Sequence, residues 1–117
     1  MSAQAKARAV NASETVLQVP LSHDSYPIVI SPAGLDRLGS WVITHAARPG
    51  SRVLLVSNPV VHQAYGARAE HSLREAGLEV SSLVIEAGEE QKRPATVALI
   101  HDAAYAHRLE RGSLMVA

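Results

Sequence analysis

The residues of this sequence best suited to chemistry lie in one short polar loop. After the apolar run 83–85, the chain places Gly88, Glu89 and Lys92 close together, before Pro94 starts a helical pattern. Glycine permits a tight turn or the close approach of a ligand, glutamate accepts hydrogen bonds, and lysine donates them. Such a pair can hold the polar edge of a cofactor. The same residues also suit a solvated loop with a weak surface ion pair, which the local sequence alone favours.

A second candidate loop follows an earlier apolar strand. Ser57 and Asn58 come directly after the run 53–56, and Pro59 opens the next helical pattern. In open parallel sheets, ligands bind beyond the carboxyl ends of the strands, where helix N-termini present free N–H groups. The Asn58 side chain can therefore either cap the helix or hydrogen-bond a ribose hydroxyl. Capping is the better prediction from the local sequence.

No other cluster predicts catalysis or metal binding. The six histidines are scattered, and no pair has the His-x-x-x-His spacing of a helical metal site. The sequence contains no Gly-x-Gly-x-x-Gly motif, no phosphate-binding loop motif and no nucleophile elbow. We therefore predict no catalytic residue and no metal ligand in this chain.

The composition argues against several classes of protein. Eleven basic residues balance eleven acidic ones, and aromatic residues are scarce, so neither a nucleic acid nor a membrane is an expected partner. No apolar run approaches the ~20 residues that span a bilayer. Cysteine is absent, which excludes disulfides and thiolate metal sites and fits a reducing compartment. We expect a soluble cytoplasmic protein.

The elements that would position the two loops follow from the spacing of the apolar residues. Residues 1–13 show little periodicity and are predicted to be a mobile leader, and residues 14–117 to form the folded domain. Strands are predicted at 16–20 and 26–30, joined as a hairpin, and at 52–57, 80–85 and 113–117. Helices are predicted from Pro32 to the stop at Pro49, from Pro59 to Gly77, and from Pro94 to Leu109.

The order of these elements predicts the fold class. Strands alternate with helices through short connections, which is typical of right-handed crossovers and of a parallel sheet covered on both faces. We expect an α/β fold: an open, mainly parallel, Rossmann-like sheet with flanking helices and an N-terminal β-hairpin. The last apolar strand runs to Ala117 with no helix after it. The domain is therefore expected to be incomplete, with an unpaired sheet edge.

Three stretches carry a resemblance to a known family. They are residues 53–61 (VLLVSNPVV), 87–92 (AGEEQK) and 109–117 (LERGSLMVA). They resemble three parts of 3-dehydroquinate synthase, a sugar-phosphate cyclase of the shikimate pathway: its strand ending in Thr-Asn or Ser-Asn, its Asp-Gly-Glu-x-x-Lys loop, and the strand before its Gly-Gly-Gly-Val-x-Gly-Asp loop. The chain departs from the family at Ala87, where Asp is usual, and it ends where the glycine-rich loop should begin.

The resemblance implies a cofactor site in the two loops. Asn58 would contact the adenosine side of NAD, and Glu89 and Lys92 would help to hold its ribose region. The full set implied as cofactor-binding is Ser57, Asn58, Gly88, Glu89, Glu90, Gln91 and Lys92. The family's metal ligands, a Glu and two His that hold zinc or cobalt, belong to a helical C-terminal domain that is absent from this chain.

The resemblance also implies an activity for the complete enzyme. It would convert the sugar phosphate 3-deoxy-D-arabino-heptulosonate 7-phosphate into 3-dehydroquinate and phosphate, acting as a homodimer, whereas this chain alone would be inactive. Two alternatives remain open. One is another sugar-phosphate cyclase, such as an aminodehydroquinate, valiolone or inosose synthase. The other is a stand-alone α/β binding or interaction module whose last strand pairs with a partner chain.

Overall fold

The computed structural model describes residues 6–11 and 14–117. The chain forms two compact units, Met1–Leu35 and Asp36–Ala117. Each unit contains its own three-stranded sheet, the first antiparallel and the second parallel. The candidate loops both belong to the second unit. Within the part of the chain that is described, no helix is both long and apolar enough to cross a membrane.

The first unit is built around the predicted hairpin, which is confirmed. Strands β2 (Glu14–Val19) and β3 (Tyr26–Ile30) pair antiparallel, with Leu17 opposite Ile28. Proline in β3 is tolerated because β3 lies at the edge of the sheet in the order β1-β2-β3.

Strand β1 (Lys6–Asn11) corrects part of the predicted leader. It pairs antiparallel with β2, although residues 1–13 were expected to lack regular structure. Basic residues alternate with alanines over 6–9, a period-two pattern whose apolar signal is weak because alanine is small. The remaining positions of that prediction, 1–5 and 12–13, lie outside the described residues.

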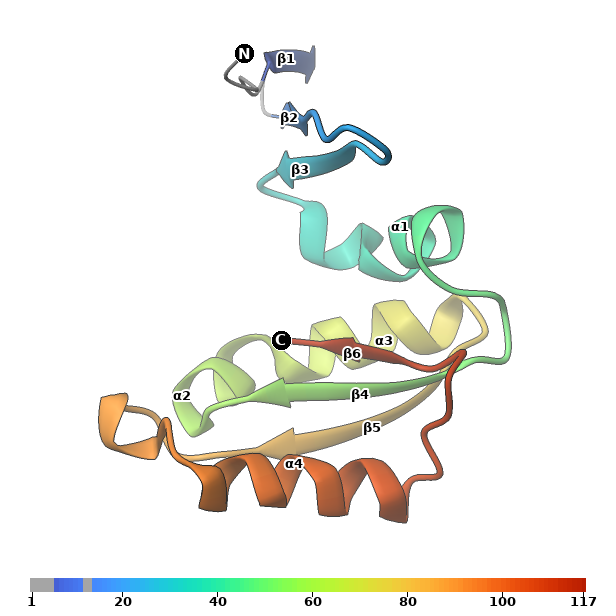
Figure 1. Ribbon diagram of the computed structural model, residues 1–117. Helices are drawn as coiled ribbons and strands as arrows, with labels where there is room; N and C mark the ends of the chain where they lie inside the picture. Colours follow the sequence, from blue (N-terminus) through green and yellow to red (C-terminus); the bar gives the residue numbers. More distant parts are fainter. Residues whose placement is uncertain (1–5, 12–13) are drawn as a thin grey trace. The chain divides into compact units, whose positions relative to one another are not determined.

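The second unit confirms the α/β fold class. Strands β4 (Arg52–Ser57), β5 (Glu79–Val84) and β6 (Leu114–Val116) are all parallel, in the order β5-β4-β6. The central strand β4 is buried from Val53 to Val56, as a strand covered on both faces must be. Helices α3 (Ala67–Glu75) and α4 (Pro94–Ala106) lie on opposite faces of this sheet (Figure 1). From β4 the chain moves to β5 on one side and then crosses to β6 on the other side of β4. Two right-handed crossovers in these opposite directions place their helices on opposite faces of the sheet.

The first helix begins later than predicted. Pro32 precedes a turn in which the Gly34 N–H donates to the Ser31 carbonyl, at 3.2 Å, and a 3-10 segment follows at Gly34–Arg37. Regular α-helix α1 spans only Leu38–His45. The tighter hydrogen bonds of the 3-10 segment delay the helix by about two turns relative to the proline signal.

The other helices follow their predicted signals more closely. The second begins at Pro59 as α2 (Pro59–Val61), passes through a π-helical turn, η2 (His62–Gly66), and continues as α3. Its end is marked by Gly77, which has a φ of 89°. Helix α4 ends three residues before the predicted Leu109, because Arg108 takes a left-handed φ of 59°.

The core of the second unit lies between α1, α3 and the sheet. Val42 of α1, Val53 of β4, Leu73 of α3 and Leu78 form one buried cluster. Side chains alternate along a strand, so Leu54, which is fully buried, lies on the opposite face of the sheet from Val53. Both faces of β4 are therefore buried, and this packing holds in place the C-terminal end of the strand, where one of the candidate loops begins.

Candidate functional site

Both predicted loops begin at the same edge of the parallel sheet. Ser57, the last residue of β4, is paired with Val84, the last residue of β5. The Ile85 N–H extends the ladder by donating to the Ser57 carbonyl at 2.8 Å. Figure 1 shows α2 and the turn after β5 at this end of the sheet. The tertiary structure thus brings together two loops that are about thirty residues apart in the sequence.

Asn58 caps the second helix, as the local sequence favoured. Its side-chain oxygen accepts a hydrogen bond from the Val61 N–H at 2.9 Å, from an extended backbone with φ −104° and ψ 168°. The neighbouring Ser57 hydroxyl donates to the Asn58 carbonyl, at a long 3.4 Å. Within the described residues, the Asn58 side-chain nitrogen donates no hydrogen bond, so capping leaves that nitrogen available to a ligand.

The second loop is a tight turn that depends on Gly88. Its φ of 119° lies in a region that residues with a Cβ rarely adopt. The turn is closed by the Gln91 N–H, which donates to the Gly88 carbonyl at 3.0 Å, and by the Lys92 N–H, which donates to the Glu89 carbonyl at 3.0 Å. These bonds form the 3-10 segment η3 (Glu89–Gln91).

The charged side chains of this turn form a single ion pair. The Lys92 Nζ lies 2.8 Å from the Glu89 Oε1, and the two side chains are 75% and 85% exposed. An ion pair this exposed contributes little to stability, so stability does not explain its presence. The Glu90 carboxylate has no hydrogen bond or ion pair within the described residues.

An apolar hollow next to the turn was not predicted. It is open to solvent and has a volume of about 810 Å³, and its lining includes Ile85, Lys92, Pro94, Val97 and Ile100. The sequence did contain a signal for it, because Pro94, Val97 and Ile100 recur at helical spacing on α4. Val97 remains 48% exposed, so this face of α4 is not part of the buried core.

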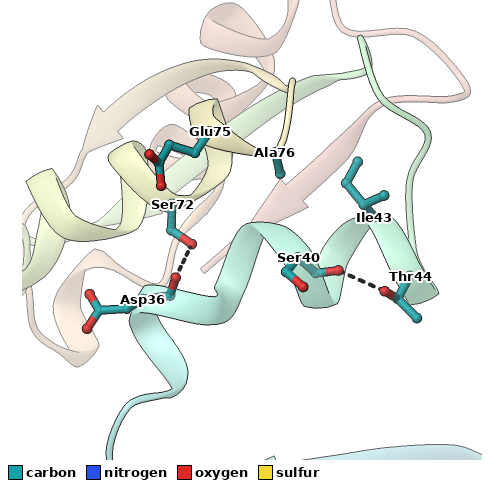
Figure 2. Close-up of a pocket in the computed structure, with 7 residues that line it drawn as sticks. All are labelled: Asp36, Ser40, Ile43, Thr44, Ser72, Glu75 and Ala76. Carbon is teal, nitrogen blue, oxygen red and sulfur yellow. Dashed lines mark hydrogen bonds between the residues drawn. The ribbon is translucent and has the colours of Figure 1, made fainter.

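A second hollow lies between α1 and α3, away from the candidate loops. It has a volume of about 350 Å³, and Figure 2 shows Asp36, Ser40, Thr44 and Ser72 among the residues that line it. The Asp36 carboxylate is already paired with Arg68, and the Ser72 hydroxyl already makes two hydrogen bonds. The side chains of Asp36 and Ser72 are thus already occupied by internal contacts.

No metal site is found within the described residues. They contain no group of three His, Asp or Glu side chains arranged to hold an ion. The described residues therefore do not fit the zinc or cobalt site of the family that the sequence resembles.

Comparison with known proteins gives a consistent result. No protein-family model matches the chain. Three curated relatives, each named 3-dehydroquinate synthase, come from Synechococcus sp. (strain CC9605), Prochlorococcus marinus (strain MIT 9313) and Gloeobacter violaceus. They are 54%, 49% and 48% identical to the chain, over 101, 108 and 103 residues respectively.

The matches cover most of this chain but only a small part of each relative. They cover 86–92% of this chain but only 27–29% of each relative, so the chain spans less than a third of the length of the relatives that it matches. The identity is high, it extends over nearly the whole chain, and it is repeated across several organisms. Over the stretch that it shares with these relatives, the chain belongs to the 3-dehydroquinate synthase family.

Proposed function

We propose that this chain forms the NAD-binding part of a 3-dehydroquinate synthase. The observation that carries the proposal is the 54% identity to a protein of that name over 86% of the chain. The reaction of the complete enzyme is then the conversion of 3-deoxy-D-arabino-heptulosonate 7-phosphate into 3-dehydroquinate and phosphate. The substrate, the metal and a homodimeric assembly are proposed for the complete protein only.

The geometry of the two loops fits a dinucleotide. They lie beyond the carboxyl ends of adjacent parallel strands, which is where open α/β sheets bind nucleotides. Gly88 has no Cβ, and the Glu90 carboxylate lies beside it, so a hydrogen-bond acceptor stands against the backbone of the turn. The neighbouring apolar hollow offers a surface for an aromatic ring, as most small-molecule sites do.

Each polar group of the site can then be given a role. The Glu89 carboxylate accepts hydrogen bonds from ribose hydroxyls, and the Lys92 ammonium, which Glu89 holds at 2.8 Å, donates to ribose oxygens. The Asn58 side-chain nitrogen supplies another donor from the adjacent strand end. When bound, NAD supplies the transient oxidation of a ring hydroxyl, whereas the role of these residues is to bind and orient it.

The proposal is tested by removing the lysine. In the full-length protein, Lys92→Ala removes a charged donor and is expected to weaken NAD binding about tenfold, as measured by calorimetry. Arg111→Ala is the matched control, because Arg111 is also exposed but lies at the opposite end of the sheet, before β6. Unchanged NAD affinity in Lys92→Ala, or no measurable binding by the unmodified protein, would count against the proposed site.

A further inference from the structure

The Glu90 side chain is exposed, and its carboxylate lies over Gly88. The Glu90 Oε1 and Oε2 atoms lie 2.5 Å and 2.8 Å from the point where a Cβ on residue 88 would be. The absence of that Cβ therefore makes room for the carboxylate. As a result, a negative charge lies against the backbone of the turn, in one of the two loops proposed to bind the nucleotide.

The charge of Glu90 is not neutralised by a neighbour. Glu89 is paired with Lys92, whose ammonium lies 2.8 Å from the Glu89 Oε1. Within the described residues, the Glu90 carboxylate has neither an ion pair nor a hydrogen bond. The two adjacent glutamates therefore differ: one is a compensated charge and the other is a free acceptor.

A free carboxylate at this position discriminates between the two nicotinamide dinucleotides. NAD carries a hydroxyl at the 2′ position of its adenosine ribose, and NADP carries a phosphate there. A carboxylate accepts a hydrogen bond from the hydroxyl and repels the phosphate. We propose that Glu90 sets the preference of this site for NAD over NADP; the inference rests on the proposed NAD site.

The other two acidic residues of this segment are less suited to the role. The charge of Glu89 is balanced by Lys92 at 2.8 Å, so it repels a phosphate less strongly. Glu86 precedes the turn, outside the segment that the Gln91-to-Gly88 hydrogen bond closes. It remains exposed and serves as the matched control for a change of charge in the same loop.

The test is a comparison of NAD and NADP affinities in the full-length protein by calorimetry. Glu90→Gln keeps the size of the side chain and removes its charge. It is expected to raise the affinity for NADP relative to NAD about fivefold, which is the effect of the repulsion between two unit charges about 4 Å apart in water. Glu86→Gln is expected to leave the ratio unchanged. High salt is expected to reduce the discrimination of the unmodified protein, since about 1 M salt shortens the screening length to about 3 Å.

Failure of this inference is distinguishable from failure of the proposed function. If Lys92→Ala weakens NAD binding but Glu90→Gln leaves the NAD-to-NADP ratio unchanged, the site exists and Glu90 does not select the cofactor. If Glu86→Gln shifts the ratio as much as Glu90→Gln, the effect is a general field and the assignment to Glu90 is overturned. If the unmodified protein binds neither dinucleotide, the proposed function fails and the inference fails with it.

Discussion

Gly39 of α1 and Ser72 of α3 are joined at the closest crossing of the two helices. The Gly39 N–H donates to the Ser72 Oγ at 2.9 Å, and the same hydroxyl donates to the Asp36 carbonyl at 3.0 Å. A Cβ on Gly39 would collide with the Ser72 backbone carbonyl. Figure 2 shows the hydrogen bond from Ser72 to Asp36 at the start of this crossing. The absence of a side chain at Gly39 thus permits its hydrogen bond to Ser72.

Gly39→Ala is expected to destabilise the protein. Alanine favours a helix by about 1 kcal/mol over glycine, but its Cβ would meet a backbone oxygen that cannot move without shifting α3. The clash outweighs the helix propensity, and a net loss of about 1–3 kcal/mol in the free energy of unfolding is expected. Urea unfolding of the chain measures it. Gly112→Ala is the control, because no atom lies within 4 Å of a Cβ there; an increase in stability for Gly39→Ala would contradict the close crossing.

Ser72→Ala tests the hydroxyl of the same crossing. The variant leaves the buried Gly39 N–H without its acceptor and the Asp36 carbonyl without a donor. A loss of about 1–3 kcal/mol in the free energy of unfolding is expected, the cost of unsatisfied buried groups. Ser40 lines the same hollow but is exposed, so Ser40→Ala serves as the control. It is expected to change the free energy of unfolding by no more than about 0.5 kcal/mol. Equal effects of the two substitutions would contradict a stabilising role for the Ser72 hydroxyl.

Asn58 variants separate capping from ligand binding. Asn58→Ala removes the acceptor of the Val61 N–H and is expected to cost about 1 kcal/mol of stability, whereas Asn58→Asp keeps the cap and its stability. Aspartate lacks the side-chain nitrogen, so Asn58→Asp is also expected to weaken NAD binding in the full-length protein. Thermal unfolding and calorimetry give the two readouts. Full stability and full NAD affinity in Asn58→Asp would leave the residue only as a cap.

The Asp36–Arg68 pair predicts a dependence of stability on acid. The Arg68 guanidinium donates to both Asp36 oxygens, at 3.1 Å and 2.9 Å, and these hydrogen bonds lower the pKa of Asp36. Because the pKa is lower in the folded state, the contribution is complete above the ordinary aspartate value of about 3.9 and is lost as the pH falls through the folded value.

The measurement compares unfolding of the unmodified chain and of Asp36→Asn across this range. The unmodified chain is expected to be the more stable at about pH 6, with the difference shrinking as the pH falls below about 3.9. Asp24→Asn, another exposed aspartate substitution, controls for the change in net charge. A difference in stability that grows as the pH falls would contradict the lowered pKa of Asp36.

Much of the secondary structure could be predicted from the sequence because its signals are local. The apolar run at 52–57 coincides with β4, and the prolines at 59 and 94 open helices at the predicted positions. The hairpin of β2 and β3 also follows from short-range patterning. The π-helical turn at His62–Gly66 was not predicted. It places the His62 ring against Gly66, whose Cβ would lie 2.6 Å from the Nδ1 atom.

The sequence by itself determined the strand and helix alternation, the positions of the two loops and the residue types that they carry, since periodicity, capping and turn chemistry act between near neighbours. Only the tertiary structure decided that β1 joins the first sheet and that α1 begins at Leu38. It also decided which glutamate of the turn is paired with Lys92 and which one folds over Gly88. These features depend on how close distant or freely rotating groups come in three dimensions, and no one-dimensional pattern fixes such distances.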